Sequence, residues 1–242
     1  MNLEVDFNKF GNDFSKNVKL SNYSWFNLGG YAEYFYKAKD KDQLKNFLKD
    51  VNDRNIKVTV LGAGSNTLIR DKGIKGAVIK LGKNFSYIKK IDKNIIEVGA
   101  ATLDRMVANF AKNNNLGDLE FLSCIPGSIG GAIKMNSGCY ENDISKVLLS
   151  INVIDKKKLS EIEIKKEDIK FSYRNTNLNE DFIFLSAKLK GTISKKAEIE
   201  KIQSNFIEKK KLSQPSQVKT CGSTFKNISN EKKAWMLIKK AG

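Results

Sequence analysis

A glycine-rich stretch between residues 120 and 140 contains the residue types best suited to chemistry in this chain. It reads EFLSCIPGSIGGAIKMNSGCY, and its turn-forming residues are Pro126, Gly127, Gly130, Gly131 and Gly138. Because glycine has no Cβ, such a segment can turn tightly and bring backbone N–H groups close to a ligand. Residues 130–135 are small and apolar enough to begin a short helix, and helix N-termini attract anions. We therefore predict a phosphate or diphosphate site here. A buried turn whose glycines only allow close packing is the alternative.

A second glycine-containing loop follows a predicted buried strand at residues 58–61. Its residues are Gly62, Ala63, Gly64, Ser65 and Asn66. A dinucleotide-binding G-x-G-x-x-G motif would need a third glycine where Thr67 stands, and the pattern of residues 67–69 favours another strand over the start of a helix. We therefore predict a loop whose amides and Asn66 side chain hold a diphosphate, with a plain hairpin turn as the alternative.

Histidine is absent from the chain, and this narrows the candidates for proton transfer. Without the side chain that most often moves protons at pH 7, a donor must be Ser, Tyr, Lys, Cys or a carboxyl group. The three cysteines, Cys124, Cys139 and Cys221, are widely spaced and form no C-x-x-C pair. These facts argue against a structural zinc site or a disulfide framework, and we predict no bound metal.

The formal charge of +16 raises the question of a nucleic-acid partner. The basic residues are nearly all lysines spread along the chain, and the four arginines are Arg54, Arg70, Arg105 and Arg174. This pattern indicates a general preference for lysine in the composition and not a nucleic-acid binding surface. Each arginine is therefore a candidate for a role that lysine cannot fill. No apolar run approaches membrane-spanning length, and the first residues lack the pattern of a signal peptide. We expect a cytoplasmic monomer without a nucleic-acid or membrane partner.

Hydrophobic periodicity predicts helices and strands around the two glycine-containing segments. One helix is predicted at residues 40–53, capped by Asp40, and a second begins at Thr102 as its cap. Strands are predicted at 31–38, 77–81, 95–98, 148–155, 159–164 and 182–189, and later helices at 195–211 and 231–240. A final segment with one short strand and one helix cannot cover its own apolar faces, so we expect this chain to be part of a longer protein.

A series of short motifs is similar to those of one enzyme family. The motifs are residues 27–30 (NLGG), 61–66 (LGAGSN), 119–121 (LEF), 125–132 (IPGSIGGA), 135–136 (MN), 171–174 (FSYR), 214–215 (QP) and 222–227 (GSTFKN). In this order, from about residue 20 to the end, they resemble the UDP-N-acetylenolpyruvoylglucosamine reductases (MurB, UDP-N-acetylmuramate dehydrogenase), which are FAD enzymes of peptidoglycan precursor synthesis. The ordered series carries the resemblance, because each motif alone is weak.

The resemblance implies an α+β fold in which two subdomains of the vanillyl-alcohol-oxidase (PCMH) type hold FAD. It assigns residues 1–192 to the FAD-binding region, with subdomains at about 1–82 and 83–192, and residues 193–242 to the N-terminal part of a substrate-binding domain. Both glycine loops then become cradles for the flavin diphosphate. The implied cofactor-binding residues are Gly62, Ala63, Gly64, Ser65, Asn66, Pro126, Gly127, Ser128, Ile129, Gly130, Ala132 and Asn136.

The resemblance also implies a reaction and the residues that carry it. NADPH reduces the flavin, and flavin N5 then delivers hydride to UDP-N-acetylglucosamine enolpyruvate, which becomes UDP-N-acetylmuramate. Arg174 matches the residue that stabilises the enolate, and a planar, permanently charged guanidinium suits a carboxylate. Ser223 matches the proton donor. The matches to substrate contacts are Lys226, Asn227 and Lys211, although Lys210 can take the register of Lys211.

One departure from the family pattern bears on activity. The family pairs the serine and arginine with a glutamate near its C-terminus, and the last glutamate here, Glu231, opens the predicted final helix and does not match it. Acting alone, these 242 residues are expected to bind flavin with little or no turnover. As part of a longer protein they are expected to form an ordinary reductase.

Two other functions remain open on the sequence. One is an FAD oxidoreductase of the same scaffold with a different substrate, and the motif at residues 222–227 argues against it. The other is a basic binding protein without enzymatic activity, which the net charge suggests. Such a protein would be colourless and would bind nucleic acid with a steep dependence on salt.

Overall fold

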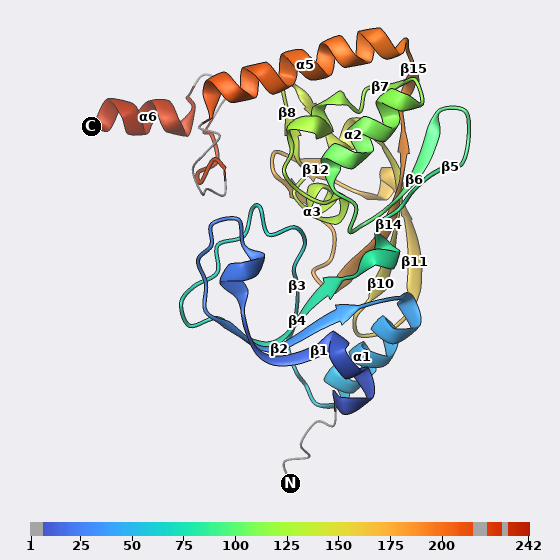
Figure 1. The fold of residues 1–242 in the computed structure, drawn as a ribbon, viewed down its shortest axis with the longest axis vertical. Coiled ribbons are helices and arrows are strands. Elements are labelled where there is room, and N and C mark those ends of the chain that lie inside the picture. Colours follow the sequence, from blue (N-terminus) through green and yellow to red (C-terminus); the bar gives the residue numbers. More distant parts are fainter. Residues whose placement is uncertain (1–6, 215–221, 229–231) are drawn as a thin grey trace.

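The described part of the chain is built on two β-sheets followed by two helices (Figure 1). The computed structural model describes residues 7–214, 222–228 and 232–242. The first sheet is formed by residues 14–81 and the second by residues 88–190. Helices α5 (Lys196–Ser213) and α6 (Ala234–Ala241) come after both sheets.

The first sheet has four strands in the order β1-β2-β4-β3. These are β1 (Phe14–Lys19), β2 (Tyr31–Ala38), β3 (Val58–Val60) and β4 (Ile74–Leu81). Strands β2, β4 and β3 run parallel, and β1 pairs antiparallel at the edge. Parallel strands end on the same edge of a sheet, so the loops after β2, β3 and β4 share that edge. In open α/β sheets this is the edge where ligands bind.

Helix α1 (Lys41–Asp53) packs against the first sheet. The Asp40 carboxylate accepts a hydrogen bond from the Gln43 amide at 2.8 Å, so the predicted cap is confirmed. The Tyr36 ring of β2 stacks on the Phe47 ring, with the two centroids 4.1 Å apart. The predicted apolar face is fully buried, and it consists of Leu44, Phe47, Leu48 and Val51.

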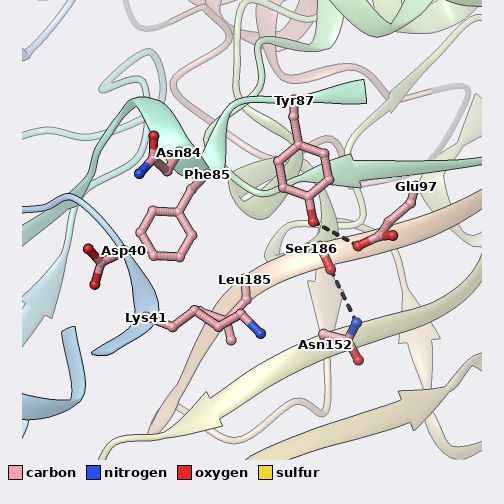
Figure 2. Close-up of a pocket in the computed structure, with 9 residues that line it drawn as sticks. All are labelled: Asp40, Lys41, Asn84, Phe85, Tyr87, Glu97, Asn152, Leu185 and Ser186. Atoms are coloured by element: carbon pink, nitrogen blue, oxygen red, sulfur yellow. Dashed lines mark hydrogen bonds between the residues drawn. The ribbon is translucent and has the colours of Figure 1, made fainter. Parts of the chain in front are cut away.

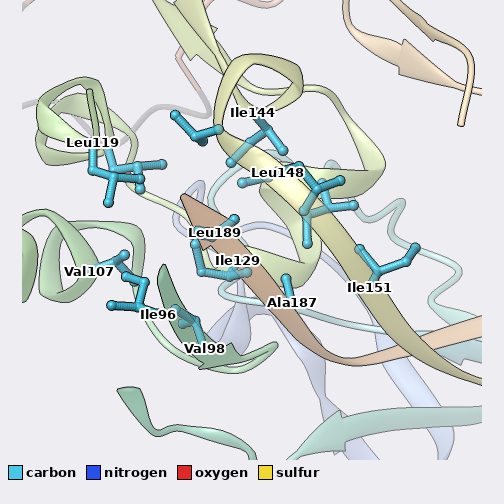
Figure 3. Packing of buried hydrophobic residues seen from close by; sticks show 14 of the residues in the cluster. Ile96, Val98, Val107, Leu119, Ile129, Ile144, Leu148, Ile151, Ala187 and Leu189 are labelled. Carbon is cyan, nitrogen blue, oxygen red and sulfur yellow. The ribbon is translucent and has the colours of Figure 1, made fainter. Parts of the chain in front are cut away.

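The second sheet is antiparallel throughout and has the order β11-β10-β14-β6-β5. Its strands are β5 (Ile88–Lys90), β6 (Ile95–Gly99), β10 (Leu148–Asp155), β11 (Glu161–Lys165) and β14 (Phe182–Lys190). The helices that share its apolar core are α2 (Asp104–Asn113), α3 (Ile129–Lys134) and α4 (Ile144–Val147). Figure 3 shows part of this core, including Ile96, Leu148 and Leu189, all fully buried.

Short strand pairs and 3₁₀ helices complete the fold. The pairs are β7 (Leu116–Gly117) with β15 (Thr192–Ile193), β8 (Gly138–Cys139) with β9 (Asn142–Asp143), and β12 (Phe171–Ser172) with β13 (Asn175–Thr176). The 3₁₀ helices are η1 (Phe7–Asp13), η2 (Leu20–Tyr23), η3 (Lys83–Phe85), η4 (Glu120–Cys124) and η5 (Lys166–Asp168).

Helix α5 packs on α2 and η4, at the top of Figure 1. The Gln203 Nε2 donates a hydrogen bond to the Ala108 carbonyl at 2.9 Å, and Ile199 is buried. Helix α6 instead exposes its large apolar side chains, which are Trp235, Met236, Leu237 and Ile238. Within the residues that the structure describes, no helix combines the length and the apolar character needed to cross a membrane.

Three local predictions needed correction. Residues 67–69 form no regular strand: the Thr67 carbonyl accepts a hydrogen bond from the Ser24 hydroxyl, and Ile69 packs against Gly29. Thr102 does not cap α2; its hydroxyl donates to the Tyr87 carbonyl at 3.1 Å, and the helix begins at Asp104. The last helix begins at Ala234, and residues 229–231 lie outside the described residues.

Candidate cofactor and active site

The two glycine-containing segments predicted from the sequence meet in the structure. The first loop is residues 62–66, which follow β3. The second segment is residues 126–132 of the glycine-rich stretch, which run into α3. A Cβ placed on Gly62 would lie 2.9 Å from the Ser128 Oγ. The first loop therefore lies directly against the second, although many residues separate them in the chain.

Gly64 gives the first loop its shape. Its φ is +73°, in the left-handed region that favours glycine. A Cβ at this position would lie 1.9 Å from the Tyr23 carbonyl oxygen, and the Trp25 amide donates to the Gly64 carbonyl at 3.1 Å. The loop is thus seated on the backbone around η2, with no room for a side chain at residue 64.

A lysine that the sequence analysis did not single out also reaches the first loop. Lys80, near the end of β4, donates from Nζ to the Gly62 carbonyl at 2.5 Å. Burial lowers the pKa of Lys80, and its cross-strand neighbour Lys37 lowers it further. The two lysines place positive charge beside the loop. Only the position of Lys80 near the end of a predicted strand pointed to it, and that signal is weak in so lysine-rich a chain.

Part of the second segment uses its amides within the protein. The Ile129 amide donates to the Thr102 carbonyl at 3.0 Å, and the Gly130 amide donates to the Ala100 carbonyl at 2.9 Å. A Cβ on Gly130 would lie 3.3 Å from the Ala100 Cβ. At these two residues the backbone serves close packing, so the start of α3 does not offer a full set of amides to an anion as the sequence suggested.

Arg174 is held by the carbonyls that follow α3. It occupies the tip of the β12–β13 hairpin with a φ of +57°. Its Nη2 donates to the Gly138 carbonyl at 2.8 Å, its Nη1 donates to the Asn136 carbonyl at 3.5 Å, and its guanidinium lies over the Tyr173 ring. The predicted catalytic arginine is therefore tied to the glycine-rich stretch.

Asn136 reinforces this connection. It is buried, its Nδ2 donates to the Ser172 carbonyl at 3.2 Å, and its Oδ1 accepts from the Ser145 amide at 3.1 Å. The side chain predicted to bind cofactor thus also joins α4, the end of α3 and the Arg174 hairpin.

The structure distinguishes the two candidate lysines of α5. The Lys210 Nζ donates to the Cys124 carbonyl at 2.6 Å, so Lys210 faces the glycine-rich stretch. Lys211 is exposed. The sequence left open which of the two lysines faces the glycine-rich stretch. In the structure Lys210, and not Lys211, lies against η4.

The remaining predicted residues lie after α5. Ser223 and Lys226 are exposed, and the Asn227 Oδ1 accepts a hydrogen bond from the Ala234 amide of α6 at 3.1 Å. In the part of the chain that the structure describes, no hydrogen bond joins Ser223 to Arg174. Cys221 lies outside the described residues.

A cavity of about 240 Å³ lies between the segments that follow β2 and β4 and the strands β6, β10 and β14 of the second sheet (Figure 2). Its lining includes Asp40, Asn84, Tyr87, Glu97 and Ser186. The Tyr87 hydroxyl donates to the Glu97 carboxylate at 2.7 Å, and burial, with this carboxylate, raises the pKa of Tyr87 to about 12. No residue predicted from the sequence to bind cofactor lines it. Across the described residues, no three Cys, Asp or Glu side chains gather as potential metal ligands.

Asp104 supports the second segment from inside the protein. It is fully buried, and neither carboxylate oxygen has a hydrogen-bond partner among the described residues. Its amide donates to the Gly127 carbonyl at 3.1 Å, and a Cβ on Gly127 would lie 2.7 Å from the Asp104 Oδ2. Burial raises the pKa of Asp104 well above its usual value, and the Gly127 backbone offsets this only in part.

We expect Asp104→Asn to stabilise the protein at neutral pH. Because the pKa is higher in the folded state, the folded chain keeps a proton that the unfolded chain loses, and stability falls as pH rises from the unfolded pKa to the folded one. The loss is about 1.4 kcal/mol for each unit between the two values. The free energy of unfolding is measured by urea denaturation at several pH values. It should be larger for the variant than for the parent at pH 7, and the two should become equal below pH 3.8, the ordinary pKa of an aspartate.

The exposed Asp92 provides the control for this prediction. Asp92→Asn makes the same change at an exposed position and should leave the free energy of unfolding at pH 7 as it is in the parent. Parallel stability curves for Asp104→Asn and the parent would show that the buried carboxyl does not titrate as stated.

The chain is similar in sequence to an FAD-binding family and to enzymes of one kind. Residues 32–158 match the family model described as an FAD binding domain. The chain is 44% identical over 245 residues to the UDP-N-acetylenolpyruvoylglucosamine reductase of Pelagibacter ubique, covering 99% of this chain and 80% of that protein. The corresponding figures for the reductase of Orientia tsutsugamushi (strain Ikeda) are 44% over 251 residues, with coverage of 100% and 80%.

A solved structure agrees with the sequence comparison. The crystal structure of UDP-N-acetylenolpyruvylglucosamine reductase (MurB) from Thermus caldophilus superposes with a TM-score of 0.81 at 29% identity, covering 94% of this chain and 79% of that one. The predicted α+β fold of the FAD-binding type is thereby confirmed. The chain belongs to the UDP-N-acetylenolpyruvoylglucosamine reductase family, whose members are FAD-dependent oxidoreductases.

Proposed function

We propose that this chain binds FAD and takes part in the NADPH-dependent reduction of UDP-N-acetylglucosamine enolpyruvate to UDP-N-acetylmuramate, in peptidoglycan precursor synthesis. The observation that supports this most is the contact between the two glycine-containing segments at Gly62 and Ser128, with Arg174 tied to the second of them. The family membership points to the same reaction. We place the reaction in the cytoplasm and assign it to a monomer.

The residues around Gly62 suit the diphosphate of FAD. Gly62 presents bare backbone, Ser128 adds a hydroxyl, and Lys80 supplies a cation whose charge opposes that of a phosphate. When bound, FAD accepts hydride from NADPH and passes it to the substrate. We assign residues 1–192 to FAD binding and residues 193–242 to the first part of the substrate domain.

Arg174 has the geometry of an electrostatic stabiliser. Two backbone carbonyls orient its guanidinium, so the charge is fixed in place before the substrate carboxylate becomes more negative. Ser223 is assigned the protonation of the substrate at C2, after closure of the segment that carries it. In this proposal Lys226 and Asn227 contact the sugar nucleotide, together with either Lys211 or Lys210 of α5.

An absorption spectrum of the purified protein is the first test. A flavoprotein is yellow, is bleached by NADPH, and regains its colour when the enolpyruvyl sugar nucleotide is added under anaerobic conditions. Bleaching without recovery by this substrate would point to another oxidoreductase or to a flavin-binding fragment. A colourless protein that cannot be loaded with FAD, and binds nucleic acid with strong salt dependence, would refute the proposal.

Arg174→Lys should slow recovery of the flavin colour by roughly 10²–10³-fold, the effect of losing one preorganised donor in an enzyme site. Lysine keeps the charge but loses the planar fork that two carbonyls orient. Bleaching by NADPH should be unchanged. Stopped-flow absorbance measures both steps, and Arg54→Lys, at an exposed arginine bonded to the Asp50 carbonyl, is the matched control. Equal rates for the two variants would remove Arg174 from the mechanism.

A further inference from the structure

Two cysteine thiols lie against each other at the two ends of the glycine-rich stretch. Cys124 is the last residue of η4, and Cys139 belongs to β8, which packs on η4. The Cys139 thiol faces the Cys124 sulfur, and the Cys139 Sγ lies 3.4 Å from the Phe121 carbonyl. Both thiols are free. The fold therefore brings together two thiols that stand fifteen positions apart in the sequence.

The surroundings make the two thiols chemically unequal. The Cys139 thiol, the Ser123 hydroxyl and the Lys210 ammonium together lower the pKa of Cys124, against the opposing effect of burial. The pKa of Cys139 is raised, because its thiol hydrogen-bonds to the Cys124 sulfur and because it is buried. The charged or titratable groups near the pair also include Tyr140, Lys209 and Arg174. Cys124 is thus the nucleophilic partner and Cys139 the one that keeps its proton.

The thiol pair is joined to the candidate active site through one residue. Gly138, directly before Cys139, accepts the hydrogen bond from the Arg174 Nη2 at 2.8 Å. Lys210, whose Nζ donates to the Cys124 carbonyl, connects the pair to α5 on its other side. Cys139 is therefore one residue away from the carbonyl that orients Arg174.

We propose that Cys124 and Cys139 form a redox-sensitive thiol pair, which hydrogen peroxide converts to an intramolecular disulfide. The Cys124 thiolate attacks one oxygen of the peroxide, the O–O bond breaks, and protonation of the departing hydroxide gives water and a sulfenic acid at Cys124. The Cys139 sulfur then displaces the sulfenic hydroxyl, which leaves as a second water, and the S–S bond forms. The two thiols lose two protons and two electrons, and one peroxide is reduced to two waters.

Disulfide formation has a consequence for the proposed reaction, and this part rests on the proposed function. Drawing Cys139 towards η4 displaces the Gly138 carbonyl from Arg174, so the guanidinium loses one of its two fixed acceptors. The oxidised protein should reduce the enolpyruvyl substrate at least tenfold more slowly, with flavin reduction by NADPH unaffected.

Peptide mapping tests the pair directly. The parent for this experiment is Cys221→Ser, which leaves only the two thiols in question. Trypsin cleaves after Lys112, Lys134 and Lys146, so Cys124 falls in peptide 113–134 and Cys139 in peptide 135–146. After peroxide treatment and blocking of free thiols, mass spectrometry should find the two peptides joined, and dithiothreitol should separate them. Recovery of separate peptides, with blocked thiols or a sulfinic acid, would overturn the proposal.

Four variants in this background serve as controls. Cys124→Ser and Cys139→Ser must each abolish the joined species, and its persistence would identify a different linkage. Lys210→Met should slow peroxide oxidation of Cys124 several-fold relative to Lys201→Met, which removes an exposed lysine from the same helix. Equal rates in these two variants would contradict the assigned role of Lys210.

The substrate step is measured before and after oxidation, in the Cys221→Ser protein and in the variant lacking all three thiols. If oxidation slows the substrate step in the Cys221→Ser protein alone, the disulfide acts on Arg174. If oxidation changes the rate equally in both proteins, that connection is disproved. If neither protein reacts with the substrate before oxidation, these 242 residues do not carry out the proposed reaction by themselves, while the joined peptides still decide the existence of the thiol pair.

Discussion

Gly64→Ala is expected to remove flavin binding and to lower the free energy of unfolding by at least about 3 kcal/mol. A left-handed backbone costs an alanine roughly 1–2 kcal/mol, and the new Cβ would lie 1.9 Å from the Tyr23 carbonyl oxygen. Backbone cannot rotate away as a side chain can, so the loop must shift, and strain of this kind produces large effects. Urea unfolding followed by circular dichroism measures the stability, and flavin fluorescence titration measures the binding.

Gly131→Ala is the matched control. Residue 131 lies within α3. Among the described residues outside the backbone of its own helix, a Cβ there would meet the Ser128 Oγ alone, at 3.9 Å. Alanine is about 0.8–1.0 kcal/mol more favourable than glycine inside a helix. We therefore expect this variant to be as stable as the parent or slightly more so. If both variants behave alike, the conformation of the first loop is not what holds the site together.

Ser223→Ala is expected to slow the substrate step by roughly 10²–10⁴-fold, the range for loss of a positioned proton donor. Reduction of the flavin by NADPH should proceed at the parent rate, because no proton reaches the substrate in that step. The two steps are followed separately by stopped-flow absorbance. Ser223→Cys retains an acidic hydrogen and should recover part of the rate, which a structural defect would not allow.

Ser204→Ala removes a hydroxyl from an exposed position of α5 and is the control for this experiment. It should change neither step. Equal loss of both steps in Ser223→Ala would mean that the residue supports folding or cofactor binding. Because Ser223 is exposed in the structure, a full effect would also imply that residues 222–228 close over the substrate during turnover.

Periodic patterns were enough to predict most of the elements. The helix that begins after Asp40 carries its cap and its four buried apolar residues within a single stretch of sequence, so local information determines it. Strands at residues 31–38 and 148–155 have the bounds that their patterns predicted. The family was also predicted from short motifs in a fixed order, and the comparisons confirm it.

Predictions failed where a side chain interacts with a segment that is distant in the sequence. Threonine is a common helix cap, yet the Thr102 hydroxyl donates its hydrogen bond to the Tyr87 carbonyl. Ile69 looked like part of a strand and instead packs against Gly29. In both cases the competing partner lies outside the window that a pattern of neighbouring residues can sample.

The sequence by itself determined which residues could do the chemistry: two glycine-containing segments, one informative arginine, and no histidine. Only the tertiary structure decided that Gly62 contacts Ser128, that Arg174 is held by Gly138, and that Lys210 reaches Cys124. The physical reason is that residue types and local periodicity depend on neighbours in the chain. Contacts between distant segments depend on how two separately formed sheets and their covering helices pack, and no local pattern encodes that arrangement.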